Sequence, residues 1–179
     1  MSSKIILNSN QLDVLTNRLV CQLIENHNDF SNTVLIGLQP RGVYFLNKII
    51  SLLKNKYNCK NISYGLLDTT FFRDDFRRND KPLNPNISDI NVKIESKSVV
   101  LIDDVLYTGR SIRAALTAIE TYGRPKLIEL LILIDRRFSR ELPIQPNYIG
   151  LQVDSIQKDR VIVNWKENEN EDSVYLINN

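Results

Sequence analysis

The sequence is short of the residues on which several kinds of catalytic and metal site depend. It has one histidine, His27, and two cysteines, Cys21 and Cys59, which stand far apart. A single histidine leaves no Ser-His-Asp or Cys-His set for nucleophilic catalysis, and the cysteine spacing fits no metal site. Two isolated cysteines are typical of a reducing compartment, so we expect a cytoplasmic location.

Strong net charge and long apolar runs are also missing. The net charge is +2, so bulk electrostatics give no argument for nucleic-acid binding, and RNA contact would need a local patch. The densest apolar stretch, residues 127–134, is far shorter than the roughly 20 residues of a membrane span. The start of the chain has no extended apolar region, which predicts no signal peptide. We therefore expect a soluble protein with no membrane contact.

The rest of the composition is that of a globular protein. Hydrophobic residues make up 42% and charged residues 25% of the 179 residues. This length fits one domain with one sizeable core. Because no repeat, low-complexity tract or linker interrupts the chain, we expect a single domain over residues 1–179.

The most informative segment joins a strand, two carboxylates and a helix. Residues 99–102 are all apolar, as in a strand buried on both faces of a parallel sheet. Asp103 and Asp104 follow, then a short turn with one glycine. Ser111 is a plausible cap for a helix over residues 112–122. This layout is typical of a ligand site at the carboxyl edge of a parallel sheet.

These residue types suit a ligand with a phosphate and a sugar diol. Adjacent carboxylates at a strand end can accept hydrogen bonds from vicinal hydroxyls, as on a ribose ring. The N–H groups of residues 108–111 and of the helix start would face a bound anion, which the helix dipole also favours. From the pattern alone, a solvated acidic turn stays open as the alternative.

A second strand, turn and helix precede this segment. Residues 34–38 predict another buried strand, and residues 43–53 an amphipathic helix. Between them, Arg41 stands beside Gly42, where an arginine can pair with an oxyanion. Such turns are common, so this segment gains meaning only beside Asp103.

The remaining apolar patterns predict one more helix and further strands. The helix begins after Asn8 or Ser9 and ends near His27. We expect His27 to be solvated or to complement the helix dipole there, rather than to be catalytic. The predicted strands are residues 62–68, 127–134, 148–151, 161–165 and 174–177. We expect Glu129 at an exposed strand start and residues 166–172 in a charged turn.

A long polar stretch, residues 69–94, has no clear periodicity. Four cations and three carboxylates lie between Arg73 and Lys81. A stretch this long without regular structure is usually functional or disordered. Two interpretations stay open from the residues alone, a mobile loop over a ligand and a charged surface hairpin.

Residues 99–111 resemble the phosphoribosyl pyrophosphate (PRPP) motif of type I phosphoribosyltransferases. Within them, Asp-Asp-Val-Leu-Tyr-Thr-Gly-Arg at residues 103–110 resembles the version in bifunctional pyrimidine-operon regulators that also act as uracil phosphoribosyltransferases. Residues 39–42 are similar to the pyrophosphate loop of that family, with Gln-Pro where relatives usually carry Lys-Thr. The likeness extends over nearly the whole chain.

Two further segments carry the same resemblance with changes. Residues 73–75, Arg-Asp-Asp, are similar to the start of the flexible catalytic loop of the family. Residues 135–144 resemble its hood segment, Asp-Arg-Gly-His-Arg-Glu-Leu-Pro-Ile. One residue is inserted here, and Arg137-Phe138 replaces Gly-His.

The resemblance implies an α/β fold with a mostly parallel sheet flanked by helices and a small C-terminal hood. The flexible loop would span about residues 69–94 and the hood about residues 135–150. The implied reaction is uracil plus PRPP giving UMP and pyrophosphate, a step of pyrimidine salvage.

The resemblance also assigns site residues. Asp103, Asp104 and Arg73 would be catalytic. PRPP and the nucleotide would be bound by Arg41, Gly42, Val105, Leu106, Tyr107, Thr108, Gly109, Arg110 and Ser111. The base hood would include Asp135, Arg136 and Arg137. Mg²⁺ would come with PRPP, near the two aspartates, with no direct protein ligand assigned.

Two other functions stay open. One is an RNA-binding attenuation regulator of pyrimidine genes that uses the PRPP site as a nucleotide sensor. The other is a phosphoribosyltransferase for purine bases. In each case we expect a homo-oligomer, a dimer or higher assembly.

We expect no tight, sequence-specific RNA binding. Asn17, Cys21, Phe138 and Leu151 stand where RNA-binding relatives usually have threonine, histidine, histidine and lysine. Each lost cation or donor removes a phosphate or base contact. A local basic cluster argues the other way: Arg136, Arg137 and Arg140.

Overall fold

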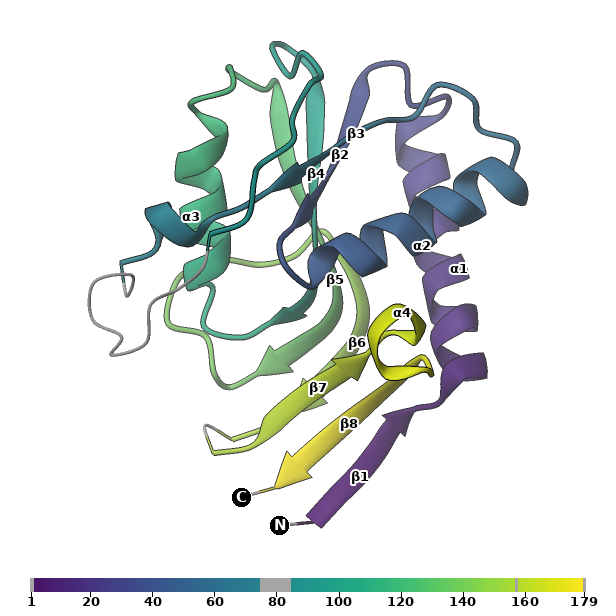
Figure 1. Cartoon of the computed structure of the whole chain (residues 1–179), viewed down its shortest axis with the longest axis vertical. Helices are drawn as coiled ribbons and strands as arrows, with labels where there is room; N and C mark the ends of the chain where they lie inside the picture. The colour runs from purple at the N-terminus through teal and green to yellow at the C-terminus, as the bar shows by residue number, and fades with distance from the viewer. Residues whose placement is uncertain (1, 75–84, 157, 179) are drawn as a thin grey trace.

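Five parallel strands form the main sheet, in the order β3-β2-β4-β5-β6 (Figure 1). The strands are β2 (Thr33–Leu38), β3 (Ser63–Leu67), β4 (Ser98–Leu106), β5 (Leu127–Arg137) and β6 (Tyr148–Asp154). The computed structural model describes residues 2–74, 85–156 and 158–178. The predicted α/β fold with a parallel sheet is confirmed, and β4 is its central strand.

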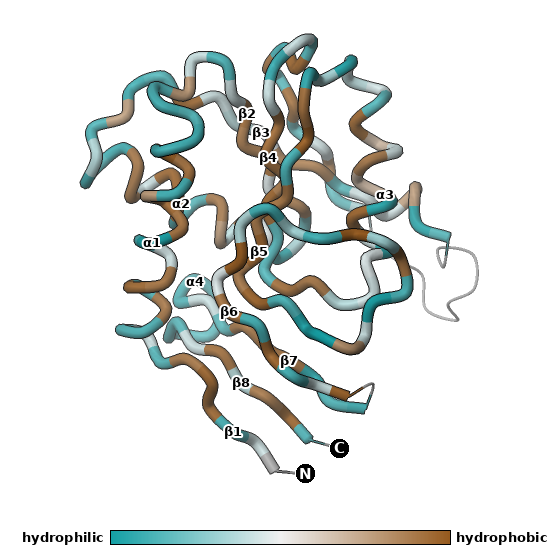
Figure 2. Tube along the Cα trace, turned by 180° about the vertical axis from the view of Figure 1, so that it is seen from behind, coloured by the Kyte–Doolittle hydropathy of each residue, from teal (hydrophilic) through white to brown (hydrophobic). Residues whose placement is uncertain are grey.

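Helices cover both faces of this sheet. They are α1 (Ser9–His27), α2 (Gly42–Asn55) and α3 (Arg110–Ile119). Val100 and Ile102 of β4 pack in one core with α1 and α2, whereas Val99 and Leu101 pack in a second core with α3. Successive side chains of a strand point to opposite faces, which explains why the run is apolar throughout. Figure 2 shows hydrophobic residues concentrated in these strands.

A smaller antiparallel sheet joins the two ends of the described chain, in the order β1-β8-β7 (Figure 1). Its strands are β1 (Ser2–Leu7), β7 (Arg160–Asn164) and β8 (Ser173–Asn178), and the short helix α4 (Lys166–Glu169) connects β7 with β8. The sequence predicts the strands of β7 and β8 but not β1. Of residues 135–150, which the resemblance assigns to the hood, 135–137 end β5 and 148–150 begin β6.

The ends of two central elements differ from the prediction. Strand β4 continues to Leu106, so the acid pair lies inside the strand, because parallel pairing with β5 extends to Leu106 opposite Asp135. Helix α3 begins at Arg110 after Gly109, which has φ 93°, and no side chain caps it. Ser111 therefore lies within the first turn of the helix, and the predicted cap is wrong.

His27 is buried at the opposite edge of the sheet, so the solvated alternative of its prediction is wrong. Its side chain is 6% exposed, with Nε2 3.1 Å from Glu129 Oε2 and Nδ1 3.0 Å from Thr33 Oγ1. Tyr148 donates its hydroxyl to Glu129 at 3.0 Å. Burial lowers the pKa of His27 against the opposing Glu129 charge and raises that of Tyr148 to about 12. Glu129, expected at an exposed strand start, is thus a partner in this network.

No helix among the described residues is long and apolar enough to cross a membrane.

Phe138 follows β5 with a backbone that glycine favours, since its φ is 65° and its side chain is 77% exposed. We expect Phe138→Gly to be more stable than Phe138→Ala by about 1 kcal/mol, because only alanine keeps the Cβ that this conformation disfavours. Both variants lose the ring and its contact with Arg137, so their difference isolates the backbone. Urea unfolding measures this difference in the free energy of unfolding.

The same pair of changes at Leu116 is the control. Leu116 lies in the middle of α3 and is 36% exposed. There the order should reverse, with alanine the more stable by about 1 kcal/mol, because glycine is a poor helix former. An alanine variant at 138 as stable as the glycine variant would contradict the strain.

Candidate active site

Asp103 and Asp104 form an acid pair at the carboxyl end of β4, in which Asp104 is buried and Asp103 is half-buried. Asp104 is 6% exposed, and its N–H donates to Asp103 Oδ1 at 2.9 Å. Burial raises the pKa of Asp103 well above its usual range, and the Asp104 charge raises it further. Burial also raises the pKa of Asp104, although the Arg41 guanidinium opposes this rise. The pair therefore favours a ligand that brings hydroxyl donors or a cation.

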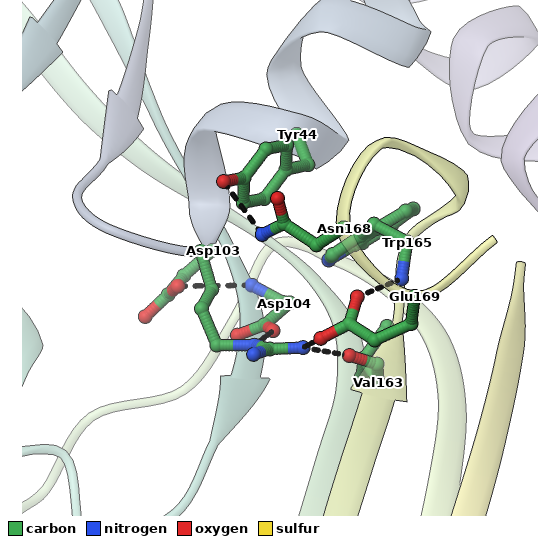
Figure 3. A network of polar contacts seen from close by, with 8 residues as sticks. Tyr44, Asp103, Asp104, Val163, Trp165, Asn168 and Glu169 are labelled. Carbon is green, nitrogen blue, oxygen red and sulfur yellow. Dashed lines mark hydrogen bonds and ion pairs between the residues drawn. The ribbon is translucent and has the colours of Figure 1, made fainter.

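Arg41 connects the acid pair to the small sheet. Its Nε lies 3.3 Å from Asp104 Oδ2, and its Nη2 donates to the Val163 carbonyl of β7 and lies 3.5 Å from Glu169 Oε1. Glu169 accepts the Trp165 N–H at 3.0 Å, as Figure 3 shows. The resemblance assigns Arg41 to pyrophosphate, and the structure places its charge beside Asp104.

Helix α4 is anchored on α2, which fixes these acceptors of Arg41. The Trp165 and Phe45 rings stack with centroids 5.7 Å apart, and Trp165 is 1% exposed. Asn168 Nδ2 donates to the Tyr44 hydroxyl at 2.7 Å (Figure 3). The C-terminal segment thus reaches the acid pair through Arg41.

Gly42 allows α2 to begin directly against β4. A Cβ at this position would lie 2.6 Å from the Ile102 carbonyl oxygen and 3.1 Å from Asp103 Oδ1. Contacts below 3.0 Å with backbone require something to shift. The glycine predicted as part of the pyrophosphate loop is therefore required for the loop to approach the acid pair.

The turn after β4 lines a cavity of about 330 Å³ together with Asp103 and Arg73. The other lining residues are Val105, Leu106, Tyr107, Thr108, Gly109, Arg110, Ser111 and Ile112. The cavity thus combines one carboxylate of the acid pair with the N-terminus of α3, where an anion is favoured. Except for Ile112, all of these residues are among the predicted site residues.

The start of the predicted flexible loop lies against α3. Arg73 follows the short helix η1 (Thr70–Phe72), and its Nη1 lies 3.5 Å from Ser111 Oγ. Asp74 forms ion pairs with Arg110 and with Arg113, the latter at 3.1 Å. Residues 75–84 of the predicted loop lie outside the described residues.

The described return of that loop runs beside β3. Leu66 and Asp89 exchange backbone hydrogen bonds of 2.9 and 2.8 Å. Asp68 accepts the Asn86 N–H at 2.8 Å. The return of the loop is therefore anchored on the end of β3, whereas Arg73 at its start lines the cavity.

The segment after β5 is tied to the same turn. Arg140 Nη1 donates to the Tyr107 carbonyl at 2.6 Å, and the Glu141 N–H donates to the Thr108 carbonyl at 3.0 Å. Arg140 also pairs with Asp135. Arg140 and Glu141 are not among the predicted site residues, because their contacts are long-range and mostly to backbone.

Magnesium has no ready-made protein cage here. No group of three or more histidine, cysteine, aspartate or glutamate side chains in the described ranges could hold a metal ion. Two adjacent carboxylates still fit an ion that keeps much of its water shell and is shared with substrate oxygens. Asp103 and Asp104 would be the residues that hold it.

These features agree with a comparison against protein families, in which the chain matches the phosphoribosyl transferase domain over residues 2–168. The chain belongs to this family. The family predicted from residues 99–111 is therefore confirmed.

Sequence relatives narrow the family further. "Bifunctional protein PyrR" of Elusimicrobium minutum is 35% identical over 174 residues, which cover 97% of this chain and 96% of the relative. The protein of the same name from Microcystis aeruginosa is 39% identical over 172 residues, 96% of each chain. The hypoxanthine phosphoribosyltransferase of Trypanosoma cruzi shares the fold, with a TM-score of 0.73, 14% identity and coverage of 98% and 96%.

We expect Asp103→Asn to raise the free energy of unfolding by about 1–2 kcal/mol near neutral pH. The folded protein holds the Asp103 proton more tightly than the unfolded chain, whose carboxyl has its ordinary pKa of 3.8. The stability from this proton is present at low pH and is lost as pH rises through the raised pKa. Urea unfolding at several pH values should show the gain shrinking toward about pH 4.

Asp68→Asn provides the control of opposite sign. Burial acts against it, but hydrogen bonds from Asn86 and Thr70 hold the pKa of Asp68 below its usual value. Its charge therefore stabilises the fold above the ordinary pKa, and the asparagine variant should lose stability at neutral pH. Equal pH dependence of the two variants would contradict the assignment.

Proposed function

We propose that this protein transfers the ribose 5-phosphate of PRPP to uracil, forming UMP and releasing pyrophosphate. The observation that carries the proposal is the acid pair beside the anion-binding turn, in a chain of the phosphoribosyltransferase family. The choice of uracil as the base rests on the resemblance of residues 103–110 to the motif of regulators that also act as uracil phosphoribosyltransferases.

Breaking the bond between ribose C1 and pyrophosphate oxygen builds positive charge on the ribose and negative charge on the leaving group. A catalyst that holds both ends and stabilises these charges needs no covalent nucleophile. Asp103 and Asp104 would accept hydrogen bonds from the two ribose hydroxyls and favour positive charge on the ring. Residues 107–111 would hold the 5′-phosphate with backbone N–H groups at the start of α3.

The pyrophosphate side would be held by the Gly42 turn, Arg41 and Arg73. Arg41 contacts Asp104 and the small sheet, so a small rotation of its guanidinium would serve either the acid pair or the leaving group. Mg²⁺, held by Asp103 and Asp104, would supply positive charge that offsets the negative charge of the leaving pyrophosphate. Closure of the predicted loop would exclude water, which competes for the ribosyl cation.

The test is pyrophosphate release from PRPP with a panel of bases. We expect turnover with uracil and none with hypoxanthine or guanine. Asp103→Asn and Asp104→Asn should each reduce turnover roughly ten- to a hundredfold, because each removes a charged hydrogen bond to the ligand. A preference for purine bases would support the purine alternative instead. Near-normal turnover in both variants would contradict the assignment of Asp103 and Asp104 to the active site.

A second candidate function is regulation of pyrimidine genes through RNA. The similar proteins are named bifunctional, which favours a second activity besides the transferase reaction. The substituted positions of the expected RNA face argue against this activity in the present chain. A homo-oligomer and a cytoplasmic location belong to the same proposal, and both rest on the sequence.

The substituted positions of the expected RNA face make contacts within the protein. Asn17 Oδ1 accepts from Lys56 at 2.7 Å and from the Tyr57 hydroxyl at 3.0 Å. Cys21 Sγ lies 3.1 Å from the same hydroxyl. A side chain that is already hydrogen-bonded must exchange that bond for a contact with RNA.

In a gel-shift titration with pyrimidine-leader RNA, UMP and salt near physiological, we expect affinity no better than for scrambled RNA. Asn17→Thr combined with Cys21→His is the matched variant, and it should bind the leader more tightly than the native protein does. Nanomolar, leader-specific binding by the native protein would establish the regulatory function instead.

A further inference from the structure

Arg136 is a buried cation whose hydrogen bonds all go to neutral acceptors. It lies in β5 and is 6% exposed. Its Nε donates to Ser155 Oγ at 2.9 Å, and its Nη2 donates to the carbonyls of Ile156 at 3.1 Å and Asp159 at 2.9 Å. Across residues 2–74, 85–156 and 158–178, no carboxylate forms an ion pair with it. The buried Asp159 carboxylate acts on this charge only from beyond ion-pair distance. A buried charge without a direct ion pair is costly, so its other contacts have to offset that cost.

The remaining contact is with the ring of Tyr107. The central carbon of the Arg136 guanidinium lies 4.0 Å from the ring centroid, within the range of a cation–π interaction. Tyr107 belongs to the turn that lines the anion cavity and is itself 37% exposed. A guanidinium is planar and weakly hydrated, which suits it to stacking on an aromatic face.

The two stacked residues, Arg136 and Tyr107, line two different cavities, and the acceptors of Arg136 lie between the two sheets. Tyr107 lines the cavity of about 330 Å³ with Asp103, whereas Arg136 lines a cavity of about 420 Å³ beneath the segment after β5. The three acceptors of Arg136 lie in the connection between β6 and β7, where the chain passes from the main sheet to the small one. A change in the position of either side chain therefore alters the surroundings of the other.

We propose that Arg136 is a positioning residue for PRPP binding. Stacked on Tyr107 and fixed by three acceptors, it holds the turn of residues 107–111 in the conformation that receives the 5′-phosphate. Residues 135–137 are expected to cover the base, but the donors of the Arg136 side chain are bonded to the connection between the two sheets. The expected role therefore does not explain this side chain. The inference rests on the proposed function, because it takes PRPP as the ligand of the turn.

Arg136→Lys separates charge from shape. Lysine keeps the positive charge but offers a point charge that neither stacks as a plane nor reaches three acceptors in the same way. We expect the dissociation constant of PRPP to rise about three- to tenfold, the range that loss of a cation–π contact gives. Arg160→Lys, on an exposed position at the start of β7, is the control and should change the constant less than twofold.

The decisive experiment is a double-mutant cycle read by calorimetric titration of PRPP with Mg²⁺. Arg136→Lys is combined with Tyr107→Phe, which keeps the ring face, and with Tyr107→Leu, which removes it. If Arg136 acts through the ring, its replacement weakens binding by the same factor in the phenylalanine background and by less than twofold in the leucine background. A merely structural arginine would cost the same in all three backgrounds, and that result would overturn the inference.

Two further readouts keep the inference separate from the proposed function. Turnover with uracil is measured in parallel: a native protein that binds PRPP without using any base overturns the proposed function, while the cycle still decides the role of Arg136. A native protein that does not bind PRPP overturns both. If Arg136→Lys does not fold, Tyr107→Leu must still bind PRPP more weakly than Tyr107→Phe, and equal binding would overturn the positioning role.

Discussion

The parallel pairing of β4 with both of its neighbours is the constraint on which the site depends. Its register with β2 and β5 brings the start of α2, the acid pair and the end of β5 to one edge of the sheet. Gly42 can then approach the backbone of Ile102 closely enough that no side chain fits between them. Because β4 is buried on both faces, a shift of register would expose apolar residues on each side, so the edge is held in place by the whole core.

The sequence predicts the parts of this protein that repeat locally. Buried strands and amphipathic helices follow from short apolar patterns, and the acid pair follows from its place after one of them. Strand β1 is missed because it depends on pairing with β8, about 170 residues later in the chain. The burial of His27 is missed for the same reason, since the starts of three strands and the end of α1 meet only in the folded protein. The contacts of Arg41, Arg136 and Arg140 with backbone carbonyls leave no pattern in the sequence at all.

The site combines charges that the fold alone would not favour. Two neighbouring carboxylates, one buried and one half-buried, share one guanidinium, and a second guanidinium is buried without a direct ion pair. Each arrangement costs free energy in the absence of ligand and would gain from one that supplies hydroxyl groups, phosphate oxygens or a cation. The opposite edge of the sheet carries a buried network around His27 and Glu129 in which most polar groups already have partners. Polar groups at the two edges therefore serve different ends, recognition at one and stability at the other.

The stacking of Trp165 on Phe45 also has a spectroscopic meaning. Trp165 is the only tryptophan of the chain, and its backbone N–H is bonded to Glu169, the carboxylate beside Arg41. Its emission therefore comes from a single, buried site. Glu169 links the backbone of this site to the Arg41 guanidinium, which contacts Asp104. A movement of Arg41 away from Glu169 would change the charge beside the carboxylate that accepts the Trp165 backbone N–H, so the emission of this tryptophan is an intrinsic fluorescent reporter of the position of Arg41.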